Sequence, residues 1–290
     1  MGFAPNRIRK QQKTPTLQQV SWHLPTVCYL LIFNFLSVMI SFNLENKVAI
    51  VTGASKGIGE SMVRLLAQAG ARVVVSSRKQ EAVDEVALDI RQAGGQAMGV
   101  AAHVGDMAQL KHLFEQAMDT YGGVDILINN AASNPVFGPV QDCETAAFDK
   151  IMDVNVKAPF ELGKLVYPVM KQRGGGSVIN ISSVEGLHPS PGLGIYSVSK
   201  SALLMLTKVM AKEWGGDNVR VNAICPGLIK TKFSQTLWEN EKMLRHFMQL
   251  TPLARMGTTD EVAALALFLA SDLSSYCTGA VFTADGGITI

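Results

Sequence analysis

The sequence predicts an α/β protein built on one doubly wound parallel sheet. From residue 46 onward, short β-branched runs alternate with longer amphipathic stretches, and the connections between them are short. The short runs are apolar almost without interruption, which is typical of parallel strands covered by helices on both faces. With 290 residues, 48% of them hydrophobic, the chain is long enough for a single domain with a substantial core.

Five segments are predicted to be strands. They are KVAIV (47–51), RVVVS (72–76), VDILIN (124–129), SVINI (177–181) and VRVNAI (219–224). The clearest helical pattern covers residues 201–214, where Leu203, Leu206 and Met210 form one apolar stripe. Residues 231–250 are predicted to form one or two helices inserted after the last of these strands. No repeat or second domain is recognisable.

Composition excludes several classes of function. A formal charge of +2, with 17% charged residues and no basic run beyond the N-terminus, argues against a nucleic-acid-binding protein. The four cysteines are far apart in sequence and the five histidines are scattered, so no metal site is predicted. Free thiols indicate a reducing compartment, and we expect a cytoplasmic protein.

Residues 1–44 differ from the predicted catalytic domain, residues 45–290. They combine four basic residues and no acidic one with an apolar run at 27–40. Three interpretations stay open: translation begins at Met39, the segment is a targeting leader or a membrane anchor through residues 27–42, or it is a packed extension. The run is shorter than the roughly 20 residues that a transmembrane helix needs.

The stretch VTGASKGIG (51–59) follows the first predicted strand and opens a helix. Its glycines, Gly53, Gly57 and Gly59, allow a tight turn and a close approach of the backbone to a phosphate, while the helix N-terminus offers free N–H groups. This pattern favours a dinucleotide site. Further along, YSVSK (196–200) places Tyr196 and Lys200 one turn apart on the same face of a helix.

Five motifs occur in the order and spacing typical of one family. TGASKGIG, NNAA (129–132), NISS (180–183), YSVSK and PG (226–227) together resemble the short-chain dehydrogenase/reductase superfamily over residues 45–290. The resemblance implies a Rossmann-type sheet, a nicotinamide cofactor and a homotetramer. NNAASNPVFG and PGLIKTKFS further resemble the branch of NADPH-dependent carbonyl and retinol reductases.

The cofactor is predicted to be NADP(H). The second strand ends in Ser76, Ser77, Arg78 and Lys79, without the acidic residue that takes the ribose 2′-hydroxyl of NAD. Arginine and lysine suit a 2′-phosphate. One position departs from the family pattern, because His103 stands where an aspartate commonly contacts the adenine amine. The resemblance assigns to the cofactor Gly53, Ser55, Lys56, Gly57, Ile58, Gly59, Ser77, Arg78, Lys79, His103, Val104, Asn130, Ala131, Tyr196, Lys200, Pro226, Gly227, Ile229 and Thr231.

The resemblance assigns a catalytic tetrad of Asn155, Ser183, Tyr196 and Lys200. Hydride transfer to a ketone creates an alkoxide, so a proton must reach oxygen, and Tyr196 is the candidate acid. A free phenol has a pKa of about 10, so we expect the Lys200 ammonium and the positive nicotinamide ring of the oxidised cofactor to lower the pKa of Tyr196. Ser183 is expected to hydrogen-bond the substrate oxygen, and Asn155 to order a water in the proton path.

We expect the substrate to be a medium-sized apolar ketone or aldehyde. Residues 184–195 and 233–250 should flank it at the carboxyl ends of the strands. His188, Leu193 and Phe233 are the predicted contacts, with Leu187, Leu237, Trp238 and Phe247 as further apolar candidates. The predicted activity is NADP(H)-dependent interconversion of a carbonyl and a secondary alcohol. The alternatives are a 3-oxoacyl-thioester reductase and a catalytically silent NADP-binding sensor.

Overall fold

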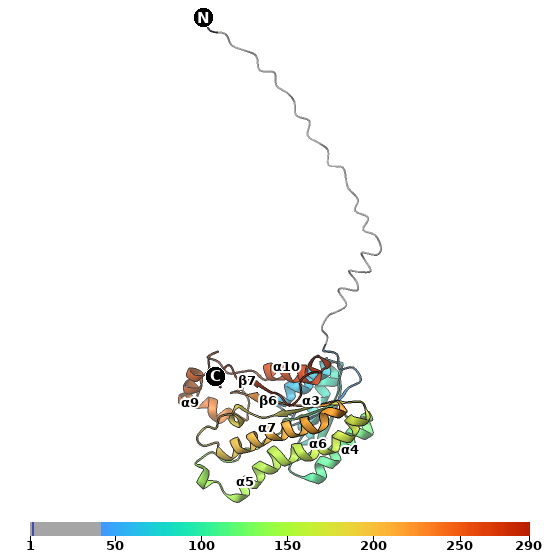
Figure 1. Ribbon diagram of the computed structural model, residues 1–290, viewed down its shortest axis with the longest axis horizontal. Coiled ribbons are helices and arrows are strands. Elements are labelled where there is room, and N and C mark those ends of the chain that lie inside the picture. Colours follow the sequence, from blue (N-terminus) through green and yellow to red (C-terminus); the bar gives the residue numbers. More distant parts are fainter. Residues whose placement is uncertain (1, 3–41) are drawn as a thin grey trace. The chain divides into compact units, whose positions relative to one another are not determined.

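A computed structural model describes Gly2 and residues 42–290. Its centre is a seven-stranded, fully parallel sheet with the strand order β3-β2-β1-β4-β5-β6-β7 (Figure 1). The predicted fold class is therefore confirmed. Strand order reverses between β1 and β4, and in open α/β sheets ligands bind at such a switch point, beyond the carboxyl ends of the strands.

The five predicted strands are all present: β1 (Val48–Thr52), β2 (Arg72–Ser77), β4 (Ile126–Asn129), β5 (Gly176–Ile181) and β6 (Val219–Pro226). The sequence prediction lacked two edge strands, β3 (Gln96–Ala101) and β7 (Val281–Ala284). β3 reads QAMGVA, with Val100 as its one β-branched residue, and β7 has four residues that are not fully buried. Both strands lie at an edge of the sheet and have short or weakly apolar sequences, so the sequence pattern did not predict them.

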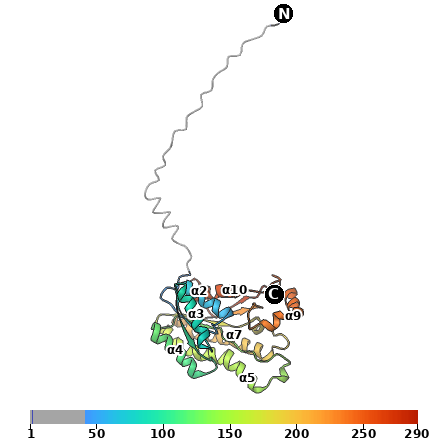
Figure 2. The same cartoon turned by 180° about the vertical axis from the view of Figure 1, so that it is seen from behind.

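Helices cover both faces of the sheet (Figures 1 and 2). Alternate strand residues point to opposite faces: Val73 and Val75 pack with α2, α3 and α10, whereas Val74 packs on the side of α4, α6 and α7. The bounds of these helices are α2 (Gly57–Gln68), α3 (Gln80–Gln92), α4 (Met107–Tyr121), α6 (Ala158–Gln172), α7 (Gly194–Trp214) and α10 (Thr259–Ala270). Two apolar cores result, one on each side of the sheet.

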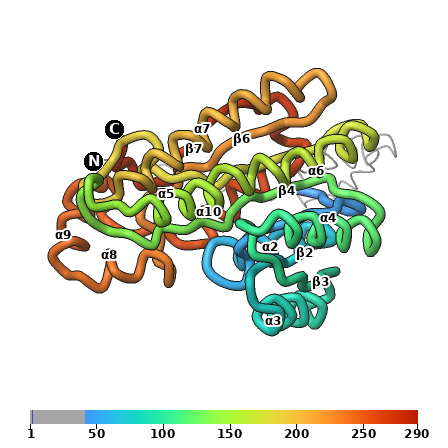
Figure 3. Tube along the Cα trace, turned by 90° about the horizontal axis from the view of Figure 1, so that it is seen from below, coloured from blue at the N-terminus to red at the C-terminus, as the bar shows by residue number. Residues whose placement is uncertain are grey.

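Three further helices lie near the carboxyl ends of the strands. α5 (Thr145–Met152) runs into α6 through a π-helical turn at Asp153–Lys157. After β6, α8 (Gln235–Glu239) and α9 (Glu241–Leu250) lie against each other, as Figure 3 shows in the orange segment. The prediction of one or two helices within residues 231–250 is thus correct.

None of the helices within residues 42–290 has the length and apolar character needed to cross a membrane. Of the apolar segment for which the sequence suggested an anchor, residues 27–42, only residue 42 lies in the part of the chain that the structure describes. The start at Met39 and the leader hypothesis fall outside the described residues.

Candidate active site

The loop between β1 and α2 is shaped by its glycines. Gly53 and Gly57 have φ angles of 65° and 62°, a left-handed conformation that residues with a Cβ rarely adopt. A Cβ on Gly59 would lie 2.5 Å from the carbonyl oxygen of Gly53, so only glycine permits this approach of helix and loop. Lys56 is the N-cap residue of α2 but makes no side-chain capping bond. The first-turn N–H groups are thus available to an anion.

Thr52 and Asn130 clamp the glycine loop to the neighbouring strand end. The Asn130 amide nitrogen donates to the carbonyl oxygens of Thr52 and Gly53 at 2.9 and 3.0 Å. The Thr52 hydroxyl accepts the backbone N–H groups of Asn130 and Ala131, both at 3.1 Å. The loop is therefore held in shape by the protein alone. This preorganisation is what a cofactor site requires.

Cations surround the end of β2. Ser55 donates a hydrogen bond to Ser77 at 3.0 Å, which joins the glycine loop to this strand end. Lys56, Arg78 and Lys79 are exposed, and none of them forms an ion pair within residues 42–290. At the same strand end, the buried hydroxyl of Ser76 has no hydrogen-bond partner among the residues that the structure describes. The donor set and the glycine cradle fit a phosphorylated dinucleotide.

His103 and Val104 follow β3 at the same edge of the sheet. Val104 is buried, and His103 is half-buried. Ala102, which precedes them, donates its N–H to the carbonyl oxygen of Ser77 at 2.8 Å. These residues therefore lie next to the strand end that carries the cations, where the predicted adenosine half would bind.

Tyr196, Lys200 and Ser183 come together at the carboxyl end of β5. Tyr196 and Lys200 are 8% and 2% exposed, and the Lys200 nitrogen lies 5.6 Å from the centroid of the Tyr196 ring. The ammonium donates to the carbonyl oxygen of Ile181 at 2.8 Å. The Ser183 hydroxyl lies close to the Tyr196 hydroxyl and accepts the Glu185 N–H at 3.1 Å. Ser182 instead donates to the Lys200 carbonyl oxygen at 2.9 Å, so only Ser183 faces the phenol.

The pKa values of this pair differ from the expectation that Lys200 acidifies Tyr196. Burial raises the pKa of Tyr196 well above its ordinary value, and the nearby Ser183 hydroxyl opposes this only in part. Burial also lowers the pKa of Lys200 to about 8. Because the ammonium points to a backbone carbonyl, the protein atoms alone do not stabilise the phenolate. In the protein alone the pKa of Tyr196 therefore shifts upward, and its lowering by Lys200 together with the cofactor ring stays a prediction.

Asn155 lies in the π-helical turn and is 1% exposed. Its oxygen accepts the Ser133 N–H at 2.8 Å, and its nitrogen donates to the Ser133 carbonyl oxygen at 3.0 Å and to the Ser199 hydroxyl at 2.9 Å. Ser199 in turn donates to the carbonyl oxygen of Tyr196 at 2.7 Å. Asn155 is therefore linked to the turn of α7 that carries Tyr196. Single π-turns often mark functional sites.

An apolar pocket opens beside Tyr196. Leu193 lines it, together with Val136, Pro139, Val140, Ile151 and Tyr196. The N–H of Gly138 donates to the carbonyl oxygen of Gly192 at 3.0 Å and joins its two walls. The Phe233 ring lies 6.2 Å from the Tyr196 ring, centroid to centroid, and is 59% exposed. Leu193 and Phe233 are thus next to Tyr196, while His188 is exposed in the adjoining loop.

The loop after β6 carries Pro226, Gly227, Ile229 and Thr231. Ile229 is buried and pairs in parallel with Gly257, whose N–H and carbonyl oxygen bond to the backbone on either side of it. The Thr231 carbonyl oxygen accepts the indole N–H of Trp238 at 3.0 Å. The loop lies next to the glycine turn, since a Cβ on Gly57 would be only 3.4 Å from the methyl carbon of Thr231.

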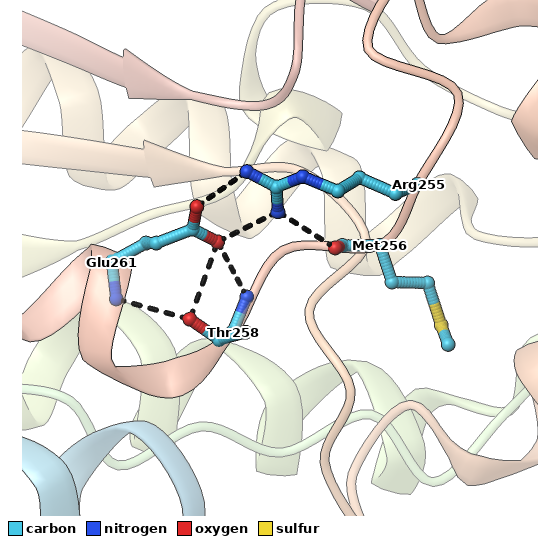
Figure 4. A network of polar contacts seen from close by, with 4 residues as sticks. All are labelled: Arg255, Met256, Thr258 and Glu261. Atoms are coloured by element: carbon cyan, nitrogen blue, oxygen red, sulfur yellow. Dashed lines mark hydrogen bonds and ion pairs between the residues drawn. The ribbon is translucent and has the colours of Figure 1, made fainter.

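A polar network fixes the strand-like segment that supports Ile229 (Figure 4). Arg255 donates to both carboxylate oxygens of Glu261, at 3.0 and 2.6 Å, and to the Met256 carbonyl oxygen at 3.1 Å. Thr258 and Glu261 form a capping box at the start of α10. The network therefore holds the segment on both sides of Gly257.

Sequence reasoning missed several residues of the site. Thr52, Ser133 and Ser199 hold the glycine loop and Asn155, but single hydroxyls form no motif. Glu185 is buried, and its carboxylate accepts the Ser190 N–H and hydroxyl at 2.8 and 2.6 Å and the Ser197 hydroxyl at 2.8 Å. The one available signal for Glu185 was a carboxylate in a segment that contains no other charged residue apart from a histidine.

Comparisons with known proteins agree with this architecture. A family model described as enoyl-(acyl carrier protein) reductase matches residues 53–289. The curated dehydrogenase/reductase SDR family member 4 of Sus scrofa is 47% identical over 244 residues, which cover 84% of this chain and 88% of the pig protein.

Solved structures also match. A gluconate 5-dehydrogenase from Burkholderia cenocepacia, in complex with NADP and tartrate, has a TM-score of 0.82 and 32% identity over 86% of this chain and 97% of its own. A 7α-hydroxysteroid dehydrogenase, complexed with NADH and 7-oxo glycochenodeoxycholic acid, has a TM-score of 0.82 and 36% identity over 85% of this chain and 96% of its own. The chain therefore belongs to the short-chain dehydrogenase/reductase superfamily.

Proposed function

We propose that this protein is an NADP(H)-dependent oxidoreductase that interconverts a carbonyl group and a secondary alcohol. The observation that carries the proposal is the meeting of Tyr196, Ser183 and Lys200 at the edge of the sheet that also holds the glycine loop. When bound, the cofactor supplies or accepts the hydride, and the positive charge of its oxidised ring favours the phenolate. The protein must supply the proton and hold the substrate.

Tyr196 is the general acid/base and Ser183 orients the substrate oxygen. The Ser183 hydroxyl lies close to the phenol, so a carbonyl oxygen within reach of both groups can accept a hydrogen bond from each. Because burial keeps the Tyr196 proton in place in the free protein, the enzyme holds the proton ready for the reduction step.

We assign supporting roles next to Tyr196 to Lys200 and Asn155. We assign to the Lys200 ammonium, 5.6 Å from the centroid of the Tyr196 ring, stabilisation of the phenolate together with the positive cofactor ring, and a hydrogen bond to the nicotinamide ribose. Asn155 fixes the backbone of Ser133 and the Ser199 hydroxyl beside α7, and we assign to it the ordering of a water that returns a proton towards Lys200.

NADP(H) is the proposed cofactor because residues 76–79, at the end of β2, include two exposed cations and no acidic residue. Lys56, Arg78 and Lys79 provide the charge, and Ser55 and Ser77 provide hydroxyl groups for a 2′-phosphate. The gluconate 5-dehydrogenase of similar fold was solved with NADP, which supports the choice.

The proposed substrate is an apolar ketone or aldehyde. The pocket beside Tyr196 has several aliphatic side chains in its lining together with Asn134 and Cys143, and the exposed Phe233 ring lies 6.2 Å from the Tyr196 ring. Leu193 and Phe233 are the proposed substrate contacts, and His188 is a polar group at the loop surface.

The test follows NADPH oxidation by the full chain with α-diketones, aromatic ketones, retinal and 3-oxoacyl thioesters. Tyr196→Phe should lower turnover by at least about a hundredfold, since a positioned general acid contributes about 10² to 10⁴ in rate. Tyr276→Phe is the matched control, because Tyr276 is fully exposed. Tyr196→Phe should still bind NADPH.

Other outcomes would overturn parts of the proposal. Unchanged turnover in Tyr196→Phe would remove the assigned acid. A larger kcat/KM with NADH than with NADPH would remove the cofactor choice. Turnover of 3-oxoacyl thioesters alone would favour the acyl-thioester reductase, and tight NADPH binding without turnover of any substrate would favour the sensor.

A further inference from the structure

Glu185 is a buried carboxylate beside Tyr196 that the proposed reaction does not use. It is 8% exposed, and its backbone N–H donates to the Ser183 hydroxyl at 3.1 Å. A Cβ on the next residue, Gly186, would lie 2.9 Å from the carbonyl carbon of Lys200. The turn that carries Glu185 is therefore packed directly against the part of α7 that carries the catalytic side chains.

The Glu185 carboxylate is held by neutral donors. One of its oxygens accepts the Ser190 hydroxyl at 2.6 Å, and the other accepts the Ser190 N–H and the Ser197 hydroxyl, both at 2.8 Å. No ion pair joins it to a cation among the residues that the structure describes. Its negative charge is therefore buried without a neutralising partner, and such a charge acts more strongly on its neighbours than a charge in water.

The Tyr196 phenol lies within reach of this charge, because Ser197, which donates to Glu185, follows Tyr196 directly. Burial is the largest cause of the raised pKa of Tyr196, and the charge of Glu185 acts in the same direction. Other titratable side chains on the elements packed around the phenol are Lys200 on the same helix, Cys225 at the end of β6, Cys143 in the pocket wall and the exposed His188 in the adjoining loop.

We propose that Glu185 is a positioning residue whose buried charge keeps the proton on Tyr196 and thereby confines alcohol oxidation to a more alkaline pH than carbonyl reduction. The inference rests on the proposed function, in which Tyr196 donates the proton during reduction and accepts it during oxidation. A nearby negative charge disfavours the phenolate. Because reduction needs the phenol and oxidation needs the phenolate, the same charge supports the first and opposes the second near neutral pH.

The pH dependence of alcohol oxidation by the full chain, at saturating NADP⁺, tests the proposal. Glu185→Gln removes the charge, so the apparent pKa in the profile of kcat/KM should fall by about one unit. Ser190→Ala is the matched control, because it breaks the same loop contact but keeps the carboxylate. A change in loop shape raises KM in both variants, whereas only loss of the charge lowers the apparent pKa.

Cofactor binding provides a readout that needs no turnover. The oxidised cofactor carries a positive ring charge that NADPH lacks, so the ratio of the two dissociation constants should change in favour of NADP⁺ as the phenol ionises. The 2′-phosphate is common to both ligands and cancels in this ratio. In Glu185→Gln the change should begin about one unit lower in pH than in the unmodified protein.

Two results would overturn the proposal. The first is the same apparent pKa in the unmodified protein and in Glu185→Gln. The second is an equal fall in Ser190→Ala, which would show that the shape of the loop acts and not the charge. Unchanged turnover in Tyr196→Phe is a different outcome, since it removes the proposed acid itself.

Ser197→Ala keeps the proposal testable even where Glu185→Gln fails to fold. This change removes one donor from the Glu185 carboxylate, so the charge is less compensated and the apparent pKa should rise by about half a unit. An unchanged or lower apparent pKa in Ser197→Ala would contradict the proposal.

Discussion

Lys200 and Tyr196 show how burial controls charge in this site. Burial lowers the pKa of Lys200 to about 8 and raises the pKa of Tyr196, so both shifts favour the uncharged form. The free protein therefore keeps its phenol protonated near neutral pH and holds a buried ammonium at a cost in stability. A lower pKa of Tyr196 therefore requires an additional positive charge beside the phenol. If the bound cofactor supplies this charge, proton release from Tyr196 is coupled to cofactor binding.

Replacing Lys200 by methionine should abolish turnover and stabilise the protein near neutral pH. The folded-state pKa of Lys200, about 8, lies below the ordinary value of 10.5. The unfolded chain thus binds more protons between these pH values, and stability rises with pH there. Near neutral pH we expect a gain of about 1 to 3 kcal/mol, from a shift of roughly two units at about 1.4 kcal/mol each less one hydrogen bond.

Denaturant unfolding at neutral pH and at about pH 10, just below the lysine reference value, measures this effect. The advantage of Lys200→Met should shrink at the higher pH, because the folded protein then holds Lys200 uncharged. A variant that is less stable than the unmodified protein at both pH values would contradict the expectation.

At the scale of elements, Glu185 ties the substrate loop to α7. Its carboxylate accepts from Ser190 on the loop and from Ser197 on the helix, and its charge contributes to the raised pKa of Tyr196. The loop that carries Leu193 therefore depends on one buried anion. We regard Glu185 as a positioning residue, since no contact with the reacting atoms is required of it.

Glu185→Gln should raise KM for the carbonyl substrate by about tenfold, because the amide nitrogen faces donors and leaves them without a partner. The Kd for NADPH should stay unchanged, since the glycine loop is held separately by Thr52 and Asn130. Steady-state kinetics and NADPH titration check both statements. Glu81→Gln, on the exposed side of α3, is the matched control. Unchanged KM in Glu185→Gln would show that the loop keeps its shape without the charge.

The network of Arg255, Thr258 and Glu261 at the start of α10 should make the free energy of unfolding depend on pH in the acidic range. The Arg255 side chain and the Thr258 N–H lower the pKa of Glu261 to about 2, from the ordinary value of 4.5. The stabilising contribution of the Glu261 carboxylate is thus complete above pH 4.5 and is lost as pH falls towards 2. Glu261→Gln should lower the urea midpoint at neutral pH and have little effect near the folded-state pKa.

The matched control for this experiment is Glu115→Gln, on the exposed pair with Lys111 at 3.5 Å. Exposed pairs of this kind contribute little, so its midpoint should hardly move. Equal effects of the two substitutions would show that the Arg255 network is no stronger than an ordinary surface pair.

At the scale of the whole molecule, the outer side of α7 is apolar. Val198, Met205 and Val209 are 51, 60 and 43% exposed and recur at helical spacing. Phe148 on α5 and Phe160 on α6 are also exposed. Such a surface suits contact with further copies of the chain, and the homotetramer stays our prediction.

Met205→Glu should lower the molar mass in solution, because a charge at a buried apolar contact is costly. Light scattering coupled to size exclusion measures it. Leu88→Glu, at an exposed leucine on α3, is the control and should leave the mass unchanged. A monomeric unmodified protein would contradict the predicted homotetramer directly.

The sequence predicted the architecture because buried parallel strands leave long apolar runs. It failed for β3 and β7, whose edge positions need fewer apolar residues. In the site, motif spacing led to Tyr196, Lys200 and Ser183, which the fold brings together. The direction of the Tyr196 pKa and the contacts of Glu185 and Asn155 could not be predicted, since burial and hydrogen bonding arise only from the tertiary structure.

The packing that buries Tyr196 and Lys200 also buries Cys225. It lies fully buried at the end of β6 near Lys200, and burial raises the pKa of its thiol. Cys143 and Cys277 are partly accessible. Among the cysteines of residues 42–290, an alkylating reagent should consequently modify these two first and reach Cys225 only when the packing around it opens. The rate at which Cys225 is alkylated therefore reports how often the packing of the catalytic centre opens, and this measurement needs no substrate.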